Sequence, residues 1–86
     1  MDNNKQKLYD NQIKELERLT QQYLLDNLNL QEEIDRTGSL SVNISVLCSN
    51  GYINCPVKNP KTNQNIEGCI NITQVNDSKT YTFGSC

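Results

Sequence analysis

The four cysteines of this 86-residue chain restrict most strongly what it can fold into. A chain of this length buries only about 60% of the surface that its unfolded form exposes, so a small core gains much from cross-links. No two cysteines have the C-x-x-C spacing of a zinc site, and no histidine is present to complete a mixed site. Two disulfides are therefore favoured over a Cys₄ zinc centre, and they imply an oxidising compartment. The cysteines are Cys48, Cys55, Cys69 and Cys86.

The first part of the chain is predicted to form one long amphipathic helix over residues 3–36. Its apolar side chains recur mostly at steps of three or four residues, which is the period of a helical stripe. Gly38 follows the stripe and predicts the end of the helix. The spacing drifts from strict heptads, so packing within the chain is favoured over a coiled coil. The stripe consists of Leu8, Tyr9, Ile13, Leu16, Leu19, Tyr23, Leu24, Leu28 and Ile34.

The end of the chain is predicted to be an antiparallel hairpin with strands at 68–75 and 79–83. A tight turn at Asn76-Asp77 joins them and sets their register. The side chains that meet in this register are all apolar, and they share one face that can pack on the helix. A slip by one residue would divide the apolar set between the two faces, so the register is well specified. The facing pairs are Ile72 with Tyr81 and Ile70 with Phe83.

Two segments between the helix and the hairpin differ in pattern. Apolar residues alternate with serine and asparagine from Ser39 to Val46, which is the period of a strand. Residues 56–67 contain two prolines and several side-chain amides, which predict a loop.

The four cysteines allow three disulfide pairings. The hairpin register places Cys69 and Cys86 near each other on the face opposite the apolar one, and Cys48 and Cys55 lie close together in the sequence. We therefore favour Cys48–Cys55 with Cys69–Cys86, the first closing the shorter loop.

Charge and side-chain chemistry favour a non-catalytic protein. The net charge is −2 and no basic patch stands out, so the signature of a nucleic-acid binder is missing. Glu32 and Glu33 are neighbours on a helix and point in different directions, which makes them a poor acid–base pair. No histidine is available to activate a serine. We expect no enzyme activity, no cofactor and no metal.

The stretch NGYINCPVKNPKT at residues 50–62 carries a family resemblance. A helix, a Gly51-Tyr52 pair, a proline-containing loop and a terminal hairpin follow one another in the order found in type IV pilins and pseudopilins. The likeness covers about residues 20–86 and is nearest to the short pilins of low-GC Gram-positive bacteria. It implies one α+β domain at 1–86, in which a long helix (1–38) lies across a small antiparallel sheet. Residues 39–67 would form turns and loops, and 68–86 the hairpin.

The resemblance also implies roles for single residues. Gly51 and Tyr52 would form a structural anchor, in which the tyrosine packs back against the long helix. The stretch before this pair is usually a short helix or turn in such proteins, and Ile44, Leu47 and Ile53 would then be buried. This expectation competes with the strand pattern that starts at Ser39, and we lean towards the helical turn.

As a pilin-like protein, the chain would assemble with other pilin subunits into a homo- or hetero-polymer at the cell surface. A helix over residues 3–36 spans about 50 Å, roughly twice the reach of so small a sheet. The first half would therefore protrude, and its apolar residues would form an assembly surface. No stretch approaches the ~20 apolar residues of a membrane anchor, so we expect that this segment was removed from the natural chain. The predicted surface consists of Leu8, Tyr9, Ile13 and Leu16.

A second interpretation is a small secreted binding protein, such as an inhibitor or a toxin-like factor, stapled by disulfides. The natural sequence upstream of Asn3 distinguishes the two. A pilin gene would encode an apolar anchor there, whereas a secreted factor would carry a cleaved signal peptide.

Overall fold

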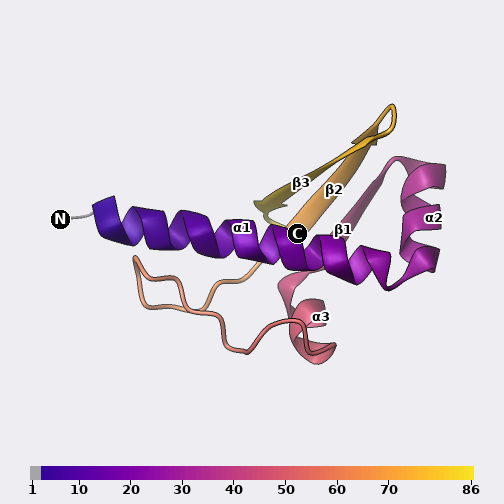
Figure 1. The fold of residues 1–86 in the computed structure, drawn as a ribbon. Helices are drawn as coiled ribbons and strands as arrows, with labels where there is room; N and C mark the ends of the chain where they lie inside the picture. The colour runs from indigo at the N-terminus through magenta and orange to yellow at the C-terminus, as the bar shows by residue number, and fades with distance from the viewer. Residues whose placement is uncertain (1–2) are drawn as a thin grey trace.

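The computed structural model describes residues 3–86 and has an α+β fold, as the sequence predicts. A long helix contacts a three-stranded antiparallel sheet with the strand order β1-β2-β3 (Figure 1). The final two strands form the predicted hairpin. In chain order the elements are α1 (Asn3–Leu25), α2 (Leu28–Thr37), β1 (Ser39–Asn43), α3 (Ile44–Ser49), β2 (Cys69–Val75) and β3 (Ser78–Gly84).

The single helix predicted over residues 3–36 is wrong, because the chain turns between Leu25 and Leu28. Asparagine side chains compete with the backbone for hydrogen bonds and so favour helix ends. The Asn27 side chain donates to the carbonyl of Tyr23, and that of Gln31 donates to the carbonyl of Leu24, both at 2.7 Å. These amides replace the backbone donors that a continuous helix would supply. As a result, α2 runs steeply away from α1 (Figure 1).

The predicted stop at Gly38 is confirmed. This glycine adopts the left-handed conformation, with φ at 87°, and its N–H donates to the carbonyl of Ile34 at 2.7 Å. The bond satisfies a carbonyl in the last turn of α2 and leaves the chain free to enter β1.

Residues 39–49 contain both the strand and the short helix that were competing predictions for this segment. The alternation forms β1 as far as Asn43, and α3 begins at the next residue. Asn43 has an extended backbone, and its side-chain oxygen accepts a hydrogen bond from the N–H of Ser45 at 2.9 Å. It therefore ends the strand and caps the helix. Ile44 and Leu47 of α3 are buried, while Ile53 is half-buried beside the core.

The register of the terminal hairpin is confirmed. Ile72 lies opposite Tyr81, and Ile70 lies opposite Phe83. The first strand, β1, extends the same apolar face by placing Leu40 beside Ile72. The other face is rich in serine, threonine and asparagine. The apolar face meets α1 and α2, whose buried side chains complete the core. The core contains Leu16, Leu24, Ile34, Val42, Ile44, Leu47, Ile66, Ile70 and Ile72.

The predicted loop between α3 and β2 is well supported by backbone contacts. The N–H of Ile66 donates to the carbonyl of Val57 at 2.7 Å, and Lys58 forms an isolated antiparallel bridge with Asn65. Ile66 is buried in the core, which holds the base of the loop in place. Between α3 and this base, the loop runs alongside the first half of α1 (Figure 1).

Candidate functional site

The four residues of the predicted assembly surface occupy different environments. Leu8 is 57% exposed, whereas Leu16 is 2% exposed and belongs to the core. Tyr9 and Ile13 are half-buried at the edge of the core. The prediction that the first half of α1 protrudes is therefore wrong for Leu16, which the chain covers itself. The exposed apolar part of this set is Leu8, together with the free edges of Tyr9 and Ile13.

The loop after α3 contacts the start of α1 at Gln6 and Tyr9. The Lys61 ammonium donates to the side-chain oxygen of Gln6 at 2.7 Å and lies 5.7 Å from the centre of the Tyr9 ring. A cation at this distance from an aromatic face is attracted by the electrons of the ring. Lys61 and Gln6 are 55 positions apart in the sequence, so local pattern contains no signal for this contact.

An open groove lies on the other side of the helix start, between α1 and β3. It has a volume of about 460 Å³. Tyr9 and Ile13 contribute apolar surface from α1, and Phe83 contributes an aromatic ring from β3. Three charged side chains of α1, Asp10, Lys14 and Glu17, also line this α1–β3 groove. The sequence places these residues on one side of a helix and predicts that the face bearing Phe83 packs on that helix, but it does not specify which turn of the helix Phe83 meets.

Tyr52 lies against α1, close to the end of that helix. Its ring meets the ring of Tyr23 edge to face, with centroids 5.5 Å apart and planes at 80°. Its hydroxyl donates a hydrogen bond to the carboxylate of Asp26. Gly51 has a φ of 80°, a left-handed conformation that L side chains rarely adopt, and so allows the turn that directs Tyr52 back to the helix.

The hydrogen bond to Asp26, followed by burial, raises the pKa of the Tyr52 phenol above its ordinary value near 10. A raised pKa in the folded state means that folding favours the protonated phenol. This stabilisation is complete below pH ~10 and is lost as the pH rises through the folded pKa. We therefore expect the urea midpoint to fall as the pH rises above about 10.

The matched control for this pH dependence is Tyr52→Phe, which keeps the ring but has no phenol. Burial also raises the pKa of Tyr81, and that contribution is present in both proteins. The difference between the two pH profiles therefore isolates Tyr52. All cysteines in residues 3–86 are paired, so thiolate exchange will not obscure the comparison. Identical profiles would show that the bond to Asp26 does not form in solution.

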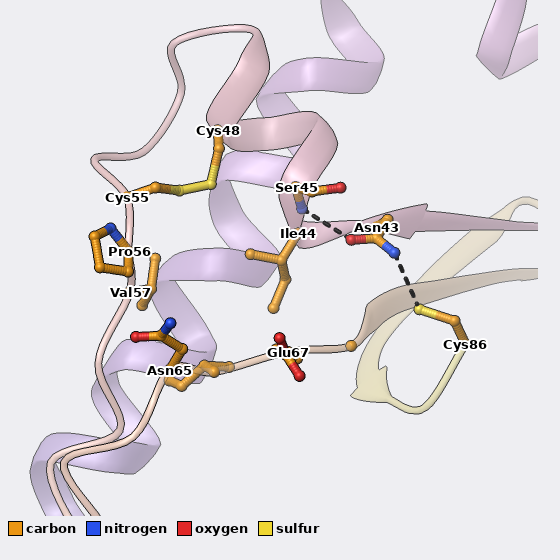
Figure 2. A pocket seen from close by; sticks show the side chains of 12 residues that line it. Asn43, Ile44, Ser45, Cys48, Cys55, Pro56, Val57, Asn65, Glu67 and Cys86 are labelled. Atoms are coloured by element: carbon orange, nitrogen blue, oxygen red, sulfur yellow. Dashed lines mark hydrogen bonds between the residues drawn. A yellow bond between two sulfur atoms is a disulfide. The ribbon is translucent and has the colours of Figure 1, made fainter.

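The structure joins Cys48 to Cys55 and Cys69 to Cys86, which is the favoured pairing. Both disulfides border a second groove, of about 480 Å³, between α3, the following loop and the end of the chain (Figure 2). Ile44, Val57 and Ile66 line its apolar part, while asparagine and serine side chains supply hydrogen-bonding groups.

Glu67 is the one ionisable side chain among the twelve residues that line this disulfide groove. The cysteine sulfurs there are oxidised, so they offer no thiolate as a nucleophile or metal ligand. A carboxylate beside apolar surface suits non-covalent contact with a neutral or positively charged group. Sequence reasoning missed this groove because Glu67 lies in a loop without periodic pattern.

Comparisons of the chain with protein-family models, curated proteins and solved structures find no match. The two disulfides suggest an oxidising location outside the cytoplasm. Within residues 3–86, no helix combines the length and apolar character that crossing a membrane requires.

Proposed function

We propose that this chain is the globular part of a pilin-like or pseudopilin-like subunit of an extracellular filament at the cell surface. The observation that carries the proposal is the arrangement of a long first helix whose N-terminal turns extend past a small sheet (Figure 1). The sheet ends in a hairpin that the Cys69–Cys86 disulfide fastens, and Tyr52 fastens the central turn to α1. These features support a rigid globular part from which the start of α1 extends.

In this proposal the protein acts by assembly and has no catalytic or cofactor-binding residues. An apolar segment preceding Asn3 would continue α1 into the centre of the filament. Neighbouring subunits would contact the first turns of α1 around Leu8, where an exposed apolar side chain gains from being covered. Repetition of one head-to-tail contact produces an open helical filament rather than a closed ring when the rotation does not close.

The test is a change of Leu8 to glutamate in the full-length protein of the source organism. A charge at this contact would have to be desolvated, so we expect at least a tenfold loss of the subunit from sheared surface filaments, measured by immunoblot. The matched control is Leu25→Glu, because Leu25 is equally exposed at 59% but lies at the opposite end of α1. Both purified domains should melt at the wild-type temperature. Equal filament yields for both variants would contradict a contact at Leu8.

The disulfide groove is the observation that favours the second candidate, a small secreted binding protein. Its apolar surface and the carboxylate side chain of Glu67 would contact a partner with a basic side chain. Recovery of the native protein as a free monomer in the medium, after removal of a signal peptide, would support this candidate. The same result would exclude the filament subunit.

A further inference from the structure

The outer edge of β3 is free to pair with another strand. The strand order is β1-β2-β3, and within residues 3–86 no strand pairs with the outer edge of β3. In an antiparallel pair, residues that exchange both backbone hydrogen bonds alternate with residues that exchange none. The two-residue turn makes Ser78 a bonded partner of Val75, so Lys79, Tyr81 and Phe83 direct their N–H and C=O groups outwards. Such an edge is a template for a further strand.

The α1–β3 groove lies beside the C-terminal part of β3, at Thr82 and Phe83. It receives the ring of Phe83 from β3 and the side chains of Tyr9 and Ile13 from α1. A strand added beside β3 would place alternate side chains on the same face of the sheet as Phe83. Those side chains would enter the groove, so backbone pairing and side-chain burial would occur together.

We propose that the added strand is β3 of a second copy of this chain, antiparallel and centred on Tyr81. The strand SKTYTFG is rich in residues that favour sheets and contains no proline. Pairing centred on Tyr81 overlaps the full length of both strands. It places Lys79 opposite Phe83 of the partner subunit, which avoids contact between two like charges, and it places Thr80 opposite the partner's Thr82, a favourable cross-strand pair.

Charge complementarity supports a second copy as the occupant. Phe83 lines the α1–β3 groove together with Asp10, Lys14 and Glu17, so the charged side chains of the groove are two carboxylates and one ammonium group, with a net charge of about −1. The partner's Lys79, directly opposite Phe83, would therefore bring its ammonium group to these two carboxylates. By symmetry the same contact forms twice, because each copy supplies both the lysine and the two carboxylates.

This contact goes beyond the filament proposal and does not depend on it. A two-fold contact uses the same surface on both copies and closes on itself, whereas a filament needs a contact that repeats without closing. The β3 edge would instead join two subunits, or two neighbouring filaments, side by side. Failure of one proposal leaves the other intact.

Sedimentation velocity of the purified domain over a range of concentrations tests the pairing. We expect reversible dimers, and we expect Lys79→Glu to raise the dissociation constant at least tenfold because it places like charges together. Lys58→Glu is the matched control, since it makes the same charge change on an exposed lysine outside the groove. Adding Asp10→Lys and Glu17→Lys to the Lys79→Glu variant should restore association.

Hydrogen exchange locates the contact. Amides of Tyr81 and Phe83 should become protected as the concentration rises, whereas those of Thr80 and Thr82, already bonded to β2, should be protected throughout. Protection at Thr80 and Thr82 in the Lys79→Glu variant also confirms that its hairpin is folded. A protein that stays monomeric up to about 1 mM would overturn the proposal. Dimers that Lys79→Glu and Lys58→Glu weaken equally would overturn it too.

Discussion

Truncation of Tyr52 to alanine is expected to lower the free energy of unfolding by about 2–4 kcal/mol, as aromatic truncations beside a core do. The side chain contacts the Tyr23 ring edge to face and donates to Asp26, so truncation removes both packing and a hydrogen bond. Aromatic pairs of this geometry contribute about 0.5–1.5 kcal/mol beyond their buried area. Urea unfolding at neutral pH measures the loss.

Two variants separate the parts of this effect. Tyr52→Phe keeps the ring contact and removes the hydroxyl of an exposed hydrogen bond, so it should cost only a small part of the loss caused by Tyr52→Ala. Tyr9→Ala removes an aromatic ring near the free end of α1, where Lys61 is the neighbouring cation. It should cost less than Tyr52→Ala because the start of a helix unfolds locally at small cost. Equal small losses at both tyrosines would show that Tyr52 is not docked on α1.

Removal of the Cys69–Cys86 disulfide, by changing both residues to alanine, is expected to cost about 3 kcal/mol. The bond spans 17 residues and restricts the unfolded chain more than Cys48–Cys55, which spans 7. The chain-entropy model gives about 2 kcal/mol for the shorter loop. Cys69 is also 3% exposed, so its truncation removes buried contacts as well.

The two double variants should be compared under non-reducing conditions at one protein concentration, because dimers would raise the apparent stability. The expected order is a larger loss without Cys69–Cys86 than without Cys48–Cys55. The reverse order would show that Cys48–Cys55 acts mainly in the folded state, by holding the Gly51–Tyr52 turn against α1. Peptide mapping of the intact protein supplies the control, since it should recover fragments joined in these two pairs.

The sequence by itself determined those parts of the fold that depend on interactions between residues close together in the chain. Alternation in β2 and β3, with a two-residue turn between them, specified that Ile72 faces Tyr81, because any slip exposes the apolar set. Gly38 marked the end of the second helix because few other residues adopt its left-handed conformation. The same hairpin register brought Cys69 and Cys86 together.

The tertiary structure alone decided the features that couple distant segments. The helical stripe continues past Asp26 and Asn27, but ending α1 there lets α2 take a different direction, so that Leu24 and Ile34 enter one core. The path of the loop around Lys61 depends on Tyr9, more than fifty positions earlier, and no local pattern records that contact. Burial of Leu16, and the groove that joins Phe83 to the start of α1, follow from the same packing. Local periodicity specifies which face of an element is apolar, whereas the choice of what covers that face belongs to the whole chain.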